Sequence, residues 1–146
     1  MIFKIYQMPA RDAIHDALVA ALIKDGWTIT HDPYFVKVGR KKGFVDLAAD
    51  KVIAASKENR KIAVEGKGFA GASELTEFEK ALGQYNLYVL AIKEKEPDRT
   101  LFLAMPDDFY RDFMEDPFFQ KIIQIYSLKI IIFSVPEEKI LTWINT

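Results

Sequence analysis

The chain has 146 residues, half of them apolar, and a net charge of −1. This length and composition predict a single domain with a substantial core, and the near-neutral charge argues against a protein that simply coats nucleic acid. The absence of cysteine excludes a disulfide framework and a thiolate zinc site, and two histidines are too few for a histidine-rich metal cage. No apolar run reaches membrane-spanning length, so we expect a cytoplasmic protein without a membrane partner.

The N-terminal part of the chain is predicted to form a helix followed by three β-rich stretches. Pro9 opens a helical pattern whose apolar face includes Leu18 and Leu22, and Gly26 is placed to end the helix in the left-handed conformation. Charged turns separate the β-rich stretches. These stretches cover residues 27–38, 44–56 and 60–67. Their order predicts an antiparallel meander.

A second helix, which should be the longest element, is predicted to start near Ser73 or Thr76. Thr76 and Glu79 have capping-box spacing, in which each side chain can bond the other residue's backbone N–H. Apolar residues then repeat at helical intervals as far as Val89. The next apolar run, at 100–105, is continuous and predicts a buried strand.

The C-terminal segment is predicted to add a helical pair and a hairpin. Residues 107–126 have a helical pattern with a break at Asp116-Pro117, because proline cannot continue a helix. Two strands then follow, at 128–134 and 139–144. This hairpin is apolar enough to be buried on both faces, and an open edge would accept a partner, so it predicts self-association.

Charged residues interrupt the apolar runs of two neighbouring strands. Because side chains alternate along a strand, Glu65 and Lys67 point to one face, and Asp46 joins them if the two strands form a hairpin. Metal-dependent phosphodiester cleavage uses such a set. Carboxylates hold Mg²⁺ or Mn²⁺, the metal lowers the pKa of a bound water, and the lysine orients that water or neutralises charge at phosphorus. The alternative is a cross-strand salt bridge on a solvated face of the sheet.

Positive charge is concentrated on the segment that carries these acids. Residues 37–67 contain nine lysines and arginines against four aspartates and glutamates, whereas the rest of the chain is acidic. Arg40, Lys41 and Lys42 lie in the first charged turn and could steer a phosphate backbone to the acids. The alternative is that this turn is simply solvated, because charged turns are common.

The order of elements resembles the restriction-endonuclease-like PD-(D/E)XK fold, an α/β fold. Its core is a helix, a three-strand meander, a helix and a strand, here with C-terminal helices and a β-hairpin. The resemblance implies that Asp46, Glu65 and Lys67 are catalytic and that the two acids bind the metal. Gln84 and Tyr88 lie one turn apart on the second helix. They resemble the Gln-x-x-x-Tyr motif of RecB-like members, which can contact nucleic acid or brace the lysine.

Four runs of sequence resemble the XisH family, cyanobacterial proteins named as fdxN element excision controlling factors. The runs are MPARD at 8–12, DGWTITHDP at 25–33, KALGQY at 80–85 and EPDR at 96–99. The resemblance begins at Met8, so it implies one domain over residues 8–146 and an N-terminal extension over residues 1–7. It also implies a role in programmed excision of a DNA element, beside a site-specific recombinase and the companion factor XisI.

One residue departs from the family pattern. Between the glutamate and the lysine the family usually has a bulky aliphatic residue, whose backbone carbonyl serves the superfamily as a metal ligand, and here the position is Gly66. The resemblance therefore makes the Gly66 carbonyl the third protein ligand. The missing side chain is expected to loosen the strand, at a cost of roughly 0.5 to 1 kcal/mol before any lost packing.

Three further acids are candidates for the site. Asp12 and Asp16 share one face of the first helix, where members of the superfamily often add an acid. Acids in a first turn also complement the helix dipole, which is the alternative for this pair. Asp50 lies four residues beyond Asp46 and is the first substitute if Asp46 is misassigned.

The resulting hypothesis is a Mg²⁺-dependent nuclease site that acts in DNA element excision. The rival hypothesis is a non-catalytic accessory protein on the same fold, which binds DNA or XisI and uses the acids structurally. A third hypothesis, an RNA-targeting nuclease, shares the site and differs in its substrate.

Overall fold

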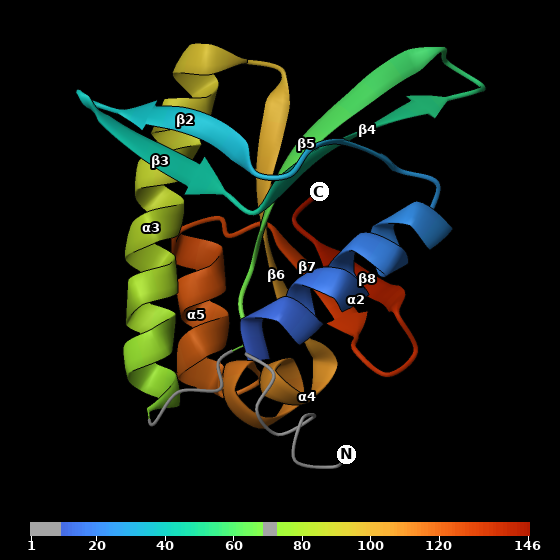
Figure 1. Ribbon diagram of the computed structural model, residues 1–146. Coiled ribbons are helices and arrows are strands. Elements are labelled where there is room, and N and C mark those ends of the chain that lie inside the picture. The colour runs from blue at the N-terminus through green and yellow to red at the C-terminus, as the bar shows by residue number, and fades with distance from the viewer. Residues whose placement is uncertain (1–9, 69–72) are drawn as a thin grey trace.

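The computed structural model describes residues 10–68 and 73–146 (Figure 1). Its helices are α2 (Ala10–Lys24), α3 (Glu74–Lys95), α4 (Asp107–Phe109) and α5 (Pro117–Ile125), and a π-helical segment, η1 (Tyr110–Met114), connects the last two. Its strands are β1 (Thr28–His31), β2 (Tyr34–Val38), β3 (Lys41–Val45), β4 (Leu47–Ile53), β5 (Glu58–Gly66), β6 (Arg99–Pro106), β7 (Ile130–Ser134) and β8 (Lys139–Ile144). None of the helices in these ranges is long and apolar enough to cross a membrane.

The strands form one mixed sheet and one separate hairpin. The mixed sheet has the strand order β1-β4-β5-β6-β7-β8, and β2 and β3 pair with each other outside it. Strand β5 pairs antiparallel with β4 and parallel with β6, while β7 is parallel to β6 and antiparallel to β8. The parallel neighbour β6 is buried along almost its whole length, as expected for a strand covered on both faces.

The mixed sheet lies between two layers, and each side has its own core (Figure 1). On one side α2 packs through Leu18 and Leu22 against Val64 and Phe102. On the other side α3, α5 and the β2–β3 hairpin cover Ala63 and its neighbours. Alternate residues of β5 therefore face opposite layers, which places Glu65 on the side of α3 and the hairpin.

Several predicted elements are confirmed. Helix α2 buries Leu18 and Leu22, and Gly26 follows it with a φ of +93°. Pro9, which was expected to open that helix, lies outside the described residues. Of the two predicted starts of α3, Ser73 is the N-cap, because its hydroxyl accepts a hydrogen bond from the Thr76 backbone N–H at 3.2 Å. The break at Asp116-Pro117 separates η1 from α5.

The predicted three-strand meander is correct only for β1, β4 and β5 of the mixed sheet. The first β-rich stretch is divided at Asp32-Pro33, and the β2–β3 hairpin is inserted between β1 and β4. Strand β3 ends at Val45 and β4 begins at Leu47, so Asp46 is a bend between two strands instead of a residue inside one. Lys41 and Lys42, predicted as turn residues, belong to β3, and Gly39 and Arg40 make the turn.

The C-terminal hairpin is only partly as predicted. Strand β7 is buried at every residue, but β8 is the edge of the mixed sheet and is partly exposed along its length. Leu141 has 43% of its surface exposed, while Trp143 packs on Phe102 with ring centroids 5.0 Å apart. The expectation of burial on both faces is therefore wrong for β8, because this edge strand contributes only partly buried side chains to the two cores.

Candidate active site

The three predicted site residues lie together at the end of β5. Glu65 is the penultimate residue of β5, Lys67 directly follows the strand, and Asp46 is the bend between β3 and β4. Glu65 Oε1 accepts a hydrogen bond from the Asp46 backbone N–H at 3.1 Å, and Asp46 Oδ2 accepts one from the Gly66 backbone N–H at 2.8 Å. Lys67 Nζ lies 3.3 Å from Glu65 Oε2. We refer to Asp46, Glu65 and Lys67 as the acid cluster.

The chain geometry explains this convergence. Strand alternation places Glu65 and Lys67 on one face, and the pairing of Lys67 with β6, through a backbone hydrogen bond to Ala104 at 3.0 Å, extends the strand geometry beyond Gly66. Asp46 lies next to Leu47, which pairs with Val64. The antiparallel register of β4 and β5 therefore places the bend opposite Glu65.

The surroundings of Glu65 disfavour the ionised form of its carboxyl group. The Glu65 side chain is 8% exposed, whereas Lys67 is 28% exposed. Burial and the nearby negative charge of Asp46 raise the pKa of Glu65 to about 7, and the charge of Lys67 and the hydrogen bonds at its carboxylate oppose that rise only in part. Glu65 is thus the buried carboxylate of the cluster, and its ionised form is the costly one.

Gly66 plays a different part from the one predicted. A β-carbon at position 66 would lie 3.0 Å from Leu18 Cδ2 and 3.5 Å from Asp46 Oδ2, so α2 occupies the space that a side chain would need. At Gly68 a β-carbon would likewise lie 3.0 Å from Ile14 Cγ1. The expectation of lost packing at Gly66 is therefore wrong: the absence of a side chain allows α2 to approach β5 closely.

The donors of the acid cluster suit a hard divalent cation. Two carboxylates and a backbone carbonyl at Gly66 are oxygen donors, which Mg²⁺ and Mn²⁺ prefer, and a cation would favour the ionised form of the buried Glu65. Within residues 10–68 and 73–146, no three or more histidine, aspartate or glutamate side chains form a group that could hold a metal. The set therefore fits a site with few protein ligands, such as those in which Mg²⁺ keeps several waters.

The predicted nucleic-acid-binding residues lie on α3 and on the β2–β3 hairpin. Gln84 Nε2 donates to Tyr88 Oη at 3.3 Å, and the Tyr88 ring packs beside Gly43 of β3. Among the described residues, no hydrogen bond joins either side chain to Glu65 or Lys67, so the predicted bracing of the lysine is not seen. Arg40, Lys41 and Lys42 are exposed on the β2–β3 hairpin, whose second strand leads directly into Asp46.

The additional acids are placed away from the acid cluster or lie outside the description. Asp50 Oδ1 lies 3.0 Å from Arg99 Nη1, so it is an ion-pair partner and not a substitute for Asp46. Asp16 is exposed on α2. Asp12 belongs to α2, but its side chain is outside the described part of the structure. His15 Nε2 lies 2.8 Å from Asp32 Oδ2, which connects α2 to the turn before β2.

Sequence reasoning missed a group of charges around a buried arginine, Arg99. The Arg99 side chain is 3% exposed, and its guanidinium bonds Glu96 at 3.0 and 3.2 Å and the Ile62 carbonyl at 3.0 Å, in addition to Asp50. Lys61 Nζ lies 3.8 Å from the Glu96 carboxylate and 3.5 Å from that of Asp98, which is 66% exposed at the rim of the group. We refer to Arg99, Asp50, Glu96 and Lys61 as the Arg99 cluster. Its sequence signal was the EPDR run at 96–99, which places a glutamate three residues before an arginine.

The fold and the acid cluster define a class: a mixed α/β protein in which two carboxylates and a lysine meet beside the last residue of a central strand. The chain belongs to the XisH family, because the family model described as "XisH protein" matches residues 8–141. The resemblance inferred from the sequence is thus confirmed at the level of this family. A search of curated proteins found no match.

Two solved structures are similar to this chain over most of its length. An XisH family protein from Nostoc punctiforme PCC 73102 has 37% identity and a TM-score of 0.82, with 91% of this chain and 99% of that chain covered. An fdxN element excision controlling factor protein from Anabaena variabilis has 38% identity and a TM-score of 0.83, with 92% and 99% covered.

Proposed function

We propose that this protein is a metal-dependent endonuclease of the restriction-endonuclease-like PD-(D/E)XK type that acts in programmed excision of a DNA element. The observation that carries the proposal is the convergence of Asp46, Glu65 and Lys67 from two different chain segments. Membership of the XisH family supports the link to excision, because a similar protein is named an fdxN element excision controlling factor.

In this proposal Asp46, Glu65 and the Gly66 carbonyl hold the divalent cation. When bound, Mg²⁺ would supply Lewis-acid activation of water and neutralise charge on the scissile phosphate. Glu65 has a pKa of about 7, so near neutral pH a cation favours its ionised form. The backbone bonds that Asp46 and Gly66 donate fix both carboxylates in place before substrate arrives.

Lys67 supplies the positive charge that the reaction needs beside the acids. Its ammonium group reaches Glu65 Oε2 and remains about one quarter exposed, with a side-chain exposure of 28%. From this position it can orient a water molecule against the phosphate and offset charge that develops in the transition state. A role in orientation requires the present geometry, so arginine, with its larger planar head, is a poor substitute.

A second candidate function is a non-catalytic accessory protein on the same fold. The observation that favours it is the reciprocal bonding at the acid cluster, where each acid accepts a hydrogen bond from backbone beside the other. Such bonds hold the bend at Asp46, where the chain passes from β3 of the hairpin to β4 of the sheet, without any metal. In this role the protein would bind DNA or the companion factor XisI and support a site-specific recombinase.

Cleavage of DNA by the purified protein separates the two functions. Duplex, branched and single-stranded DNA are incubated with Mg²⁺ or Mn²⁺, and Glu65→Gln serves as the control because it keeps the size of the side chain and removes its charge. We expect cleavage that Glu65→Gln reduces about a hundredfold or more, with an unchanged circular dichroism spectrum. No cleavage of any substrate with either metal would favour the accessory function.

A further inference from the structure

The outer face of the β2–β3 hairpin combines aromatic rings with positive charge. The register pairs Phe35 with Phe44 and Lys37 with Lys42. Because side chains alternate, these four residues share one face, and the opposite face packs on the core. Phe44 has 53% of its surface exposed, although a phenylalanine normally prefers the interior.

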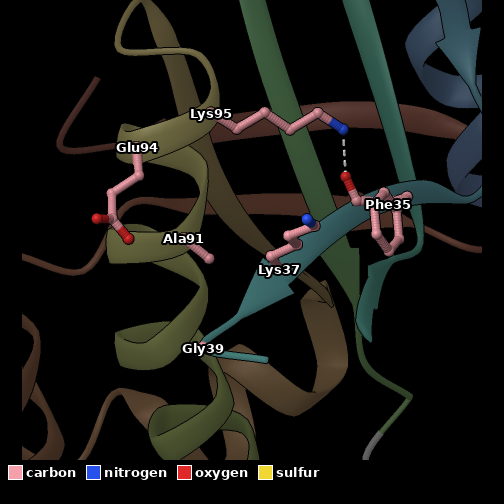
Figure 2. A pocket seen from close by; sticks show the side chains of 6 residues that line it. All are labelled: Phe35, Lys37, Gly39, Ala91, Glu94 and Lys95. Carbon is pink, nitrogen blue, oxygen red and sulfur yellow. Dashed lines mark hydrogen bonds between the residues drawn. The ribbon is translucent and has the colours of Figure 1, made fainter. Parts of the chain in front are cut away.

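The rings and the cations of this face are close to one another. The ring centroids of Phe35 and Phe44 are 5.9 Å apart, and Lys42 Nζ lies 5.6 Å from the Phe35 centroid. Lys95 of α3 lies 5.3 Å from the same centroid and donates a hydrogen bond to the Phe35 carbonyl (Figure 2). Two cations are thus held beside the Phe35 ring, and the more exposed Phe44 ring is the larger surface for stacking. We refer to Phe35, Lys37, Lys42 and Phe44 as the hairpin face.

The charge of the hairpin is entirely positive. Residues 34–45 contain Lys37, Arg40, Lys41 and Lys42 and no aspartate or glutamate. Within the described part of the chain, none of these four cations forms an ion pair with a carboxylate. Four uncompensated cations on a short hairpin repel one another, and a polyanion would offset that repulsion.

A hollow adjoins the hairpin face. It has a volume of about 490 Å³, and it is lined by Phe35, Lys37 and Gly39 of the hairpin and by Ala91, Glu94 and Lys95 of α3. Figure 2 shows the Lys37 and Lys95 side chains on the hairpin side, while the Glu94 carboxylate points away from the hairpin. The part of the hollow nearest the ring is thus bordered by positive charge.

We propose that the hairpin face binds DNA with unpaired bases, by stacking bases on Phe44 and Phe35 while the surrounding cations contact the phosphates. This inference rests on the proposed function, for which it specifies the substrate. Only unpaired bases expose their flat faces to a protein ring, since in a duplex these faces are stacked on each other. Phe44 lies two residues before Asp46, so the proposed stacking surface adjoins the bend that carries one of the acids.

Binding is measured by fluorescence anisotropy with a labelled oligothymidylate and with a labelled duplex, in EDTA so that cleavage plays no part. We expect Phe44→Leu to weaken binding of the single strand about tenfold and binding of the duplex less than twofold. Phe44→Trp keeps an aromatic surface and should retain the affinity. The matched control is Phe118→Leu, because Phe118 is 62% exposed on α5, away from the hairpin.

The outcomes distinguish this inference from the proposed function. Equal affinity of wild type and Phe44→Leu for the single strand, with folding confirmed by circular dichroism, overturns the stacking role even if the protein cleaves DNA. Tighter binding of an oligouridylate than of the oligothymidylate overturns DNA as the source of the strand. If binding of the single strand depends on Phe44 but the protein cleaves no DNA, the stacking role is supported and the proposed nuclease function is wrong.

Discussion

Strand β5 lies beside two groups of charged side chains, in which the pKa of a glutamate is shifted in opposite directions. Near Lys61 and Ile62, in the middle of the strand, hydrogen bonds, mainly from Arg99 with a smaller effect from Tyr34, lower the pKa of Glu96 in the Arg99 cluster to about 2. At the end of the strand, burial and the charge of Asp46 raise the pKa of Glu65 in the acid cluster to about 7.

The difference indicates which group is structural and which is available for chemistry. In an ion network whose charges are already paired, removing one partner is costly, and an added cation gains little binding energy there. A buried carboxylate that is costly to ionise gains from any added cation, and strongly perturbed pKa values are concentrated at functional sites. The Arg99 cluster therefore serves as an internal reference against which the acid cluster can be tested.

Removal of the Arg99 guanidinium should have the largest effect on the stability of the fold. Arg99→Met removes the buried guanidinium that bonds both Asp50 and Glu96, and we expect the free energy of unfolding to fall by about 3 to 5 kcal/mol. Urea denaturation measures the change. Arg111→Met is the matched control, because Arg111 is 61% exposed beside Asp112 and should matter by less than about 1 kcal/mol. Similar losses in both variants would contradict a structural Arg99 cluster.

A side chain at Gly66 should disturb the acid cluster by a steric route. Gly66→Ile forces Leu18 away from β5 and should lower the free energy of unfolding by about 1 to 3 kcal/mol. If α2 is the obstacle, the cost is less than additive when Leu18→Ala is combined with it, as a double-mutant cycle will show. In contrast, Gly83→Ala on α3 meets no atom within 4 Å and should stabilise by about 0.5 to 1 kcal/mol. A stabilising Gly66→Ile would refute the close approach.

The raised pKa of Glu65 predicts a loss of stability with rising pH. Between about pH 4.5 and 7 the folded state keeps the Glu65 proton while the unfolded state releases it, so the free energy of unfolding falls across this range. Glu65→Gln should remove that fall, so that its free energy of unfolding exceeds that of the wild type by about 3 kcal/mol at pH 8 and equals it below pH 4.5. Urea denaturation at a series of pH values tests this, and parallel pH profiles of the two proteins would contradict it.

Glu96 should respond in the opposite direction. Its pKa is lowered to about 2, so the stability that it contributes is present above about pH 4.5 and is lost as the pH falls toward 2. Glu96→Gln should cost about 1 to 2 kcal/mol at pH 7 and little at pH 2, because its carboxylate bonds Arg99 and Tyr34. Thermal denaturation at both pH values measures the difference. An equal cost at both would show that charge is not the cause.

A divalent cation should stabilise the protein through the acid cluster alone. At ten times its dissociation constant, Mg²⁺ or Mn²⁺ adds about 1.4 kcal/mol, which is about 3 to 6 °C in melting temperature. Glu65→Gln should show a much smaller shift, whereas Glu96→Gln should shift as the wild type does. Equal shifts in the wild type and Glu65→Gln would place the cation elsewhere.

Local patterns were enough to predict most of the fold. Strand alternation placed Glu65 and Lys67 on one face, and helical periodicity with a serine cap located α3. The inserted hairpin was missed, because the run around Phe44 reads as one strand, and only pairing with β2 shows that it ends at Val45. The turn signal at Asp32-Pro33 was present and would have divided the first stretch.

The site was predicted as a set of residues but not as a geometry. The prediction that Asp46 lies near Glu65 assumed a hairpin between their two strands. In the structure Asp46 is a bend, and the two carboxylates accept hydrogen bonds from the backbone N–H groups of Asp46 and Gly66. Gly66 was misjudged because its packing depends on the distance to Leu18, which is far away in the chain. The Arg99 cluster unites three strands and a helix end, and no local pattern describes such a contact.

The reciprocal hydrogen bonds at the acid cluster also bear on how this sequence can diverge. Loss of the Asp46 side chain leaves the Gly66 backbone N–H without its acceptor, and loss of Glu65 does the same to the Asp46 N–H. Neither acid can therefore be replaced alone by a residue without a side-chain acceptor oxygen, since the backbone beside the other acid would lose a hydrogen bond. We expect descendants of this chain to keep an acceptor at both positions or to lose both together, so that a lineage losing both would also rebuild the bend that connects the hairpin to the sheet.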